Sequence, residues 1–219
     1  MSRLRFVISL SLDGYVAGPQ QSVENPLGIG GEQLHHWAFA TKTFRAAHDM
    51  EGGDTGDSDR VAREQFDGVG ATLMGRNMFG GHPGPWDEDK PWNGWWGSNP
   101  PFHHPVFVLT HHPRPPLVLD GGTTFTFVTD GIESALAQAR HAAGDKVVAI
   151  GGGANVARQY LAAGLVDEME LNLVPILLGG GERLFDGIGT DMHGLELVRT
   201  VATPAVTHLK FARGGRGRS

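Results

Sequence analysis

A run of glycines between an apolar stretch and a helix-like stretch is the first segment with the chemistry to bind a ligand. The segment "VVAIGGGANVARQYL" covers residues 147–161. Glycine lets the backbone approach a ligand closely, and a following helix points its first N–H groups and its positive dipole end at the same place. The segment therefore predicts an anion site, although a tight strand–helix junction would also use glycine. It is neither a Walker loop nor a complete dinucleotide fingerprint, since the Lys-Ser/Thr pair and the third spaced glycine are absent.

Two further segments place phosphate-binding side chains directly after apolar runs. In "LMGRNMFG" a short buried strand ends at Met74, and Gly75 and Arg76 open the next segment. In "VFVLTHHPRP" another strand leads into a cluster of hydroxyl, imidazole and guanidinium groups. An arginine at the carboxyl end of a strand can clamp a phosphate bidentately, whereas a lone arginine more often makes a surface ion pair. Three strands that each end in such a loop favour one shared phosphate-binding site.

The elements that must position these loops follow from hydrophobic patterning. We predict strands over residues 5–11, 70–75, 105–110, 124–129, 146–150, 168–174, 195–202 and 205–212. We predict helices over residues 32–48, 59–67, 132–143 and 154–163, with Asp130 and Glu133 as a capping box for the third. Strands that alternate with helices and end in an antiparallel hairpin predict an α/β fold with a mixed sheet. No repeat or linker interrupts the pattern, so we expect one domain over residues 1–219.

Composition argues against several classes of function. The chain has 219 residues, of which 40% are hydrophobic and 19% charged, and its net charge of −6 disfavours a nucleic-acid surface. The basic stretch 210–219 is short and glycine-rich, so we expect a frayed end. No apolar stretch is long enough to cross a membrane, and the first residues lack the pattern of a secretion signal. We therefore expect a cytoplasmic protein that binds neither nucleic acid nor membrane.

A metal site is not expected either. The chain has no cysteine, and its 11 histidines include three adjacent pairs rather than a spaced zinc motif. Neighbouring residues on a strand point to opposite faces, so such a pair cannot chelate one ion. The acidic stretch 51–59 lacks the ligand order of a calcium loop.

Taken in order, these segments resemble the dihydrofolate reductase-like superfamily, and within it the reductase domain of bacterial riboflavin biosynthesis, the RibD C-terminal domain. The resemblance runs from Leu4 to Phe211. It rests on "SLSLDGYVAG", "LMGRNMF", "VLTHHPRP", "AIGGGANVARQYL" and "VDEMELNLVPILLGGGERLF". It implies a mixed, mostly parallel central sheet that is flanked by helices and closed by an antiparallel hairpin.

The resemblance also implies a cofactor, NADPH, and hydride transfer to a C=N or C=O group of a small heterocyclic or sugar-linked substrate. The glycine turn corresponds to the pyrophosphate loop of the family, and the histidine–arginine loop corresponds to its 2′-phosphate and adenine loop. The implied cofactor-binding residues are Ser9, Gly75, Arg76, Asn77, Met78, Thr110, His111, His112, Arg114, Ile150, Gly151, Gly152, Gly153, Ala154 and Asn155. The alternative is a protein that binds NADP without catalysing a reaction.

The group that protonates the acceptor is open at this stage. Folate reductases carry a carboxylate on the first helix, where this chain offers Glu32, with His35 or His36 as substitutes. Glu32 would equally suit the dipole of the first helical turn. Asp13 is a second candidate, although an Asp-Gly turn explains it as well.

Tryptophans are concentrated in residues 84–102, a stretch that we expect to be loop. Trp86, Trp92 and Trp95 could line a substrate pocket opposite Trp37, or they could fasten the loop to the body of the protein. These rings, together with the apolar face of the strand 168–174, are more apolar surface than a small domain readily hides. Related reductases pair through their sheets, so we expect a homodimer.

Overall fold

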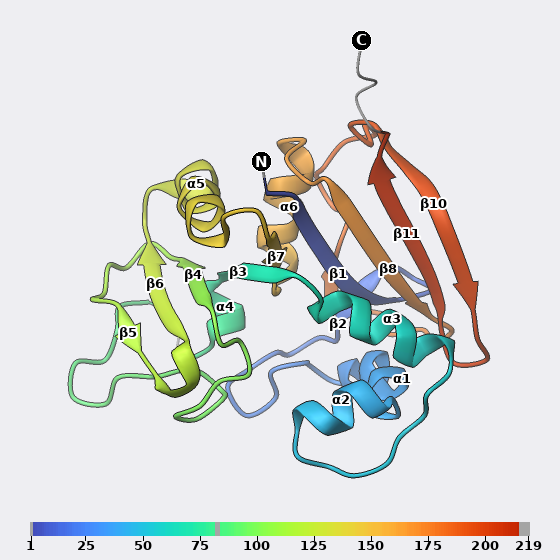
Figure 1. Cartoon of the computed structure of the whole chain (residues 1–219), viewed down its shortest axis with the longest axis horizontal. Helices are drawn as coiled ribbons and strands as arrows, with labels where there is room; N and C mark the ends of the chain where they lie inside the picture. The colour runs from blue at the N-terminus through green and yellow to red at the C-terminus, as the bar shows by residue number, and fades with distance from the viewer. Residues whose placement is uncertain (1, 82–83, 215–219) are drawn as a thin grey trace.

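A nine-stranded sheet forms the centre of the computed structural model, which describes residues 2–81 and 84–214 (Figure 1). The strand order is β10-β11-β8-β1-β7-β3-β4-β6-β5, and the six strands from β8 to β6 are parallel. β5 is antiparallel at one edge, and β11 and β10 are antiparallel at the other. This topology confirms the predicted mixed, mostly parallel sheet with its terminal hairpin.

The strand bounds agree closely with the hydrophobic pattern. They are β1 Leu4–Ser11, β3 Val69–Gly75, β4 Pro105–Leu109, β5 Leu117–Val118, β6 Thr124–Val128, β7 Val147–Ile150, β8 Glu168–Val174, β10 Leu195–Ala202 and β11 Thr207–Arg213. A second, two-stranded sheet pairs β2 (Tyr15–Ala17) with β9 (Glu182–Arg183). The two-residue strands β5 and β9 are too short to be read from a pattern of alternation.

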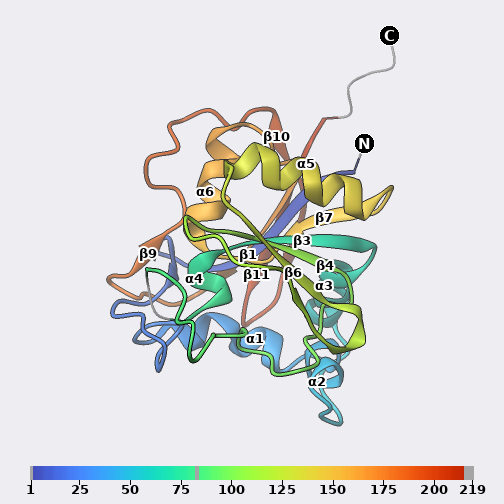
Figure 2. The same cartoon turned by 90° about the vertical axis from the view of Figure 1, so that its left-hand side faces the viewer.

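Helices cover both faces of the large sheet (Figure 2). On one face lie α5 (Gly131–Ala143) and α6 (Ala154–Ala162), each followed by a left-handed glycine, Gly144 and Gly164. The other face carries the 3₁₀ helix η1 (Gly31–His35), α1 (His36–Phe39), α2 (Lys42–Ala47) and α3 (Asp57–Phe66). Two further short helices are α4 (Arg76–Phe79), directly after β3, and η2 (Asp120–Gly122).

Buried apolar side chains form three clusters around this sheet. The largest fills the space under α5 and α6 and includes Phe6 and Tyr160, whose hydroxyl donates to the carbonyl of Ile132 at 2.8 Å. A second joins Leu34 and Trp37 to the sheet on the opposite face. The third surrounds Phe79 and receives the rings of the tryptophan-rich loop. Each cluster anchors one wall of the cleft described below.

Two local predictions were wrong. The expected helix 32–48 is divided into η1, α1 and α2, because the hydroxyl of Thr41 accepts the N–H of Phe44 at 3.2 Å and starts a new helix there. The predicted capping box of α5 is not formed, since the Asp130 side chain makes no capping hydrogen bond and Gly131 takes a left-handed conformation.

The basic end was expected to fray. Its first residues instead extend β11 to Arg213, and residues 215–219 lie outside the described part.

None of the helices in the described ranges is both long and apolar enough to cross a membrane.

Candidate active site

A large cleft of about 1090 Å³ opens at the carboxyl ends of the parallel strands. Parallel strands bring their carboxyl ends to one edge, so loops that are far apart in sequence meet there. Ser9 of β1, Gly75 of β3, Gly151 after β7 and Thr110 after β4 all line this cleft. The predicted convergence of the loops on one site is therefore present. Most of the predicted cofactor-binding residues line it, namely Ser9, Gly75, Arg76, Asn77, Met78, Thr110, His111, His112, Gly151, Gly152, Gly153, Ala154 and Asn155.

Backbone hydrogen bonds of the glycines join the ends of β3 and β7. The N–H of Gly75 donates to the carbonyl of Gly152 at 3.1 Å, and the N–H of Gly151 donates to the carbonyl of Leu73 at 2.8 Å. A Cβ at position 75 would lie 2.9 Å from Cγ2 of Val156, so glycine is required there. Gly152 has a φ of +126°, a conformation that side chains rarely adopt.

Gly153 differs from its neighbours in a way that bears on ligand binding. It is the residue before α6, its φ is −43°, and a Cβ built on it would meet no atom within 4 Å. The first N–H groups of a helix have no acceptor within the helix and carry the positive end of its dipole. Because Gly153, Ala154 and Asn155 line the cleft, α6 presents an anion-binding terminus to open space.

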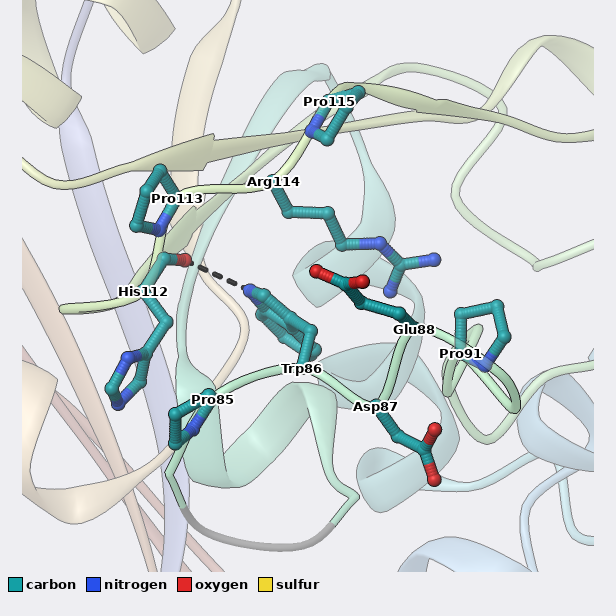
Figure 3. Close-up of a pocket in the computed structure, with 9 residues that line it drawn as sticks. All are labelled: Pro85, Trp86, Asp87, Glu88, Pro91, His112, Pro113, Arg114 and Pro115. Atoms are coloured by element: carbon teal, nitrogen blue, oxygen red, sulfur yellow. Dashed lines mark hydrogen bonds between the residues drawn. The ribbon is translucent and has the colours of Figure 1, made fainter.

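Two arginine guanidinium groups lie close to the Trp86 ring, and Figure 3 shows Trp86 with one of them, that of Arg114. The Arg76 guanidinium lies 3.8 Å from the centroid of the Trp86 ring, and that of Arg114 lies 5.1 Å from it. Burial lowers the pKa of Arg76, and the nearby positive charge of Arg114 lowers it further. Arg76 also donates to the carbonyl of Gly80. The chain thus holds two positive charges close together against an aromatic face, which favours an anionic ligand.

Arg114 and Ile150 lie outside the large cleft, contrary to the implied site. Arg114 lines a neighbouring cavity of about 320 Å³ together with Trp86 and Glu88 (Figure 3). Its guanidinium donates to the carbonyl of Trp92 at 2.5 Å and to Oδ1 of Asn93 at 2.7 Å, so it braces the loop. Ile150 is 4% exposed and belongs to the main core.

The loop tryptophans are fastened by their indole N–H groups. Trp86 donates to the carbonyl of His112 at 2.8 Å, Trp92 to that of Phe79 at 2.8 Å, and Trp95 to that of Met78 at 2.9 Å. Trp95 lines the large cleft, whereas Trp86 and Trp92 do not. The sequence predicted that Trp86, Trp92 or Trp95 lines the pocket, and the structure places Trp95 there, while the rings of Trp86 and Trp92 pack against the cluster around Phe79. Trp96, which we did not single out, does line it.

Trp37 lines the cleft as predicted, but as a buried clamp. Its indole N–H donates to the hydroxyl of Ser9 at 3.0 Å, and its ring meets the edge of His208 at a centroid distance of 4.8 Å. Asn172 of β8 lies beside Ser9 and also lines the cleft. Sequence analysis missed Asn172 and His208. The available signal was a polar residue at every second position of a strand that is buried on both faces.

The two predicted carboxylates are not part of the cleft wall. Glu32 is exposed in the first turn of η1, where it suits the helix dipole. Asp13 accepts hydrogen bonds from the Ser11 hydroxyl at 2.5 Å and from the backbone N–H groups of Leu178 and Gly179. The Ser11 hydrogen bond, followed by the backbone ones, lowers the pKa of Asp13 to about 2. Asp13 therefore ties two loops together as a carboxylate.

Other titratable and polar groups that line the cleft were not predicted to bind the cofactor. On the β1 side His35 lines it, and burial followed by the charge of His36 lowers the pKa of His35. Glu182 is the one carboxylate among the described lining residues, and it lies 3.4 Å from the guanidinium of Arg158. Across residues 2–81 and 84–214, no three histidine or acidic side chains cluster in a way that could hold a metal ion.

Comparisons with known proteins agree with this geometry. A putative riboflavin biosynthesis protein from Shewanella sp. PV-4 is 22% identical, with a TM-score of 0.58 over 97% of this chain and 99% of that one. Dihydrofolate reductase from Enterococcus faecalis, solved with NADP(H), is 16% identical, with a TM-score of 0.51 over 97% and 96%. The TM-scores indicate a shared fold, and at identities this low the likeness shows the fold alone.

A longer protein contains the same fold. In the Thermotoga maritima diaminohydroxyphosphoribosylaminopyrimidine deaminase/5-amino-6-(5-phosphoribosylamino)uracil reductase, the match covers 97% of this chain but 57% of that one, at 12% identity and a TM-score of 0.55. No curated protein matches the sequence. The family model of the RibD C-terminal domain matches residues 3–209, so the chain belongs to the RibD C-terminal domain family.

Proposed function

We propose that the protein is an NADPH-dependent reductase that transfers a hydride to a C=N or C=O group of a small heterocyclic or sugar-linked substrate. The observation that carries the proposal is the single cleft in which the glycine turn, Arg76 and the loop after β4 converge. Membership of the RibD C-terminal domain family supports the same reaction class. The substrate class is proposed together with the reaction class.

The residues that line the cleft fit such a cofactor. Gly153 leaves open space where a side chain would stand, at the N-terminus of the nine-residue helix α6, so a pyrophosphate could approach the backbone there. Arg76 and the histidines His111 and His112 would hold the 2′-phosphate that distinguishes NADPH from NADH. Thr129 and Gly131, after β6, extend the same wall.

The bound cofactor would supply the hydride, and the chain would bind, orient and shield the reacting groups. Trp95 and Trp37 both line the cleft, and their rings would help to exclude water from a bound ring. Burial keeps His35 neutral at pH 7, because it lowers the pKa. Since neither Glu32 nor Asp13 lines the cleft, a water molecule held at the β1 side would deliver the proton to the acceptor.

The test has two readouts on the same protein. Enhancement of NADPH fluorescence measures binding, and the loss of NADPH absorbance with pterins, ribosylaminopyrimidines and simple carbonyls measures turnover. We expect binding and turnover with at least one heterocycle. Binding without turnover across the whole panel would favour the alternative, a non-catalytic NADP-binding protein, and absence of NADPH binding would refute both.

Gly153→Val provides the site control for this test. The φ of −43° is negative and an added Cβ meets no atom within 4 Å, so the variant should fold with a thermal midpoint close to that of the unmodified protein. Its side chain would occupy the space proposed for the pyrophosphate and weaken NADPH binding ~10-fold or more. Gly152→Val is a poorer test, because its φ of +126° would strain the fold itself.

The remaining expectations from the sequence stay proposals. We propose a cytoplasmic homodimer whose partner is a small-molecule substrate rather than a nucleic acid or a membrane.

A further inference from the structure

Three polar side chains form a row across neighbouring strands beneath the β1 side of the cleft. In the sheet register Ser9 of β1 lies beside Asn172 of β8, and Asn172 lies beside His208 of β11. All three are buried, with exposed fractions of 5%, 2% and 0%. Ser9 and Asn172 line the cleft, whereas His208 does not. A buried polar row at the base of a cleft is costly unless each group is satisfied or meets a ligand.

Hydrogen bonds give this row a fixed direction. Nδ1 of His208 lies 2.6 Å from Oδ1 of Asn172, and an amide oxygen can only accept, so Nδ1 carries the proton. Nε2 of the neutral ring then accepts the hydroxyl of Ser58 at 3.1 Å. Burial, with a contribution from the charge of Arg199, lowers the pKa of His208 to about 4 and so keeps the ring neutral at pH 7. His208 thereby orients the Asn172 amide.

The outcome is a pair of hydrogen-bond donors at the base of the cleft. Oδ1 of Asn172 is taken by His208, which leaves the amide N–H groups for other partners. Nδ2 has no hydrogen-bond partner within the described ranges. It is also not one of the solvent-inaccessible side-chain atoms that lack a partner, and Asn172 lines the cleft, so Nδ2 reaches the cleft. The Ser9 oxygen accepts the indole N–H of Trp37, and its own proton remains available to donate.

We propose that Asn172 and Ser9 determine substrate specificity by donating hydrogen bonds to the carbonyl oxygens of a heterocyclic acceptor. This inference rests on the proposed function and deepens it, because it assigns the side of the cleft that the substrate occupies. A ring that presents carbonyl oxygens satisfies both donors, whereas a ring that presents amino groups at the same positions leaves donors facing donors. His208 and Ser58 act as positioning residues, because they fix the amide without reaching the cleft.

The experiment uses uracil and 2,4-diaminopyrimidine as matched probes, titrated calorimetrically into the full chain with and without saturating NADPH. The unmodified protein should bind uracil more tightly. Asn172→Asp replaces the donating nitrogen by an accepting oxygen, so uracil affinity should fall ~10-fold or more and diaminopyrimidine affinity should rise. Ser9→Ala removes the second donor without adding a charge and should lower uracil affinity alone. The matched control Asn99→Asp, on the exposed loop outside the cleft, should leave both affinities unchanged.

Each outcome decides the matter. A folded Asn172→Asp or Ser9→Ala protein that keeps the ratio of the two affinities would overturn the inference. So would an unmodified protein that binds neither probe or prefers diaminopyrimidine. Absence of NADPH binding refutes the proposed reductase instead, since the preference between the probes is also measured in the cofactor-free protein.

Discussion

At the scale of single residues, Arg76 is the side chain whose replacement best tests the choice between NADPH and NADH. It lines the cleft, and burial and the positive charge of Arg114 both lower its pKa. A negatively charged ligand group beside Arg76 would therefore be favourable. We predict that Arg76→Ala weakens NADPH binding ~10- to 100-fold while NADH binding changes little, because only NADPH carries the 2′-phosphate. Fluorescence titration with both cofactors measures the difference.

Arg114→Ala is the informative comparison for Arg76→Ala. The two guanidinium groups share the Trp86 ring, but Arg114 lies outside the large cleft and holds the loop through Trp92 and Asn93. We expect this variant to lose thermal stability and to change the NADPH-to-NADH preference far less. Equal losses of preference in both variants would mean that the pair acts through the loop rather than through the phosphate.

At the scale of elements, the tryptophan-rich loop 84–102 is held by tryptophans with different roles. Trp92 and Trp95 meet edge to face at 4.7 Å, but only Trp95 lines the cleft. We predict that Trp92→Leu and Trp95→Leu each lower the free energy of unfolding by ~2–3 kcal/mol, and that only Trp95→Leu raises the apparent KM for the substrate. Denaturant unfolding and steady-state kinetics separate the two effects. A raised KM in both variants would show that fixing the loop is itself required for substrate binding.

The same scale explains what the sequence could and could not predict. Strand ends and the glycine turn were predictable, because period-two patterns and left-handed glycines are local properties. The direction of the loop tryptophans was not, since it depends on backbone carbonyls such as those of Phe79 and His112, which tertiary packing brings near. The row of Ser9, Asn172 and His208 depends on strand register over a separation of 163 residues along the chain between the first two, and no local pattern encodes that register.

At the scale of the whole molecule, buried His208 should make the fold sensitive to acid. Its pKa in the folded protein is about 4, against 6.5 for the unperturbed group. Between these values the unfolded chain binds a proton that the folded chain does not, so stability falls as the pH falls from 6.5 to 4. The loss is at most ~3 kcal/mol, from a pKa shift of about 2.5.

Urea unfolding at a series of pH values measures this effect of His208. In that range the slope of the free energy of unfolding against pH reports how many more protons the unfolded chain binds than the folded one. We expect this number to be smaller by about one in His208→Gln than in the unmodified protein. His141→Gln, on the exposed side of α5, should keep the slope of the unmodified protein. An unchanged slope in folded His208→Gln would assign the acid sensitivity to another group, for example the buried Asp59, whose hydrogen bonds to Thr43 and Arg63 outweigh its burial and lower its pKa.

Assembly is the second property at this scale, and the structure changes the reasons for expecting a homodimer. The apolar residues Met169 and Leu171 of β8 are buried, because β8 lies inside the sheet between β1 and β11 and not at a surface. The rings of the tryptophan-rich loop likewise pack onto the cluster around Phe79. Exposed apolar side chains instead include Leu197 and Val198 of the edge strand β10, which are 54% and 58% exposed beside a register irregularity.

We therefore predict that a homodimer forms through the β10 edge. An eight-residue edge strand with exposed apolar side chains is a ready surface for pairing, whereas the opposite edge, β5, has two residues. Light scattering at micromolar concentration should give twice the chain mass, and Val198→Lys should give the mass of one chain, because a buried lysine in such an interface is strongly unfavourable. Since β10 does not line the cleft, the Val198→Lys monomer should retain NADPH affinity. A dimer that survives this substitution would place the interface elsewhere, and a monomer in the unmodified protein would remove the prediction altogether.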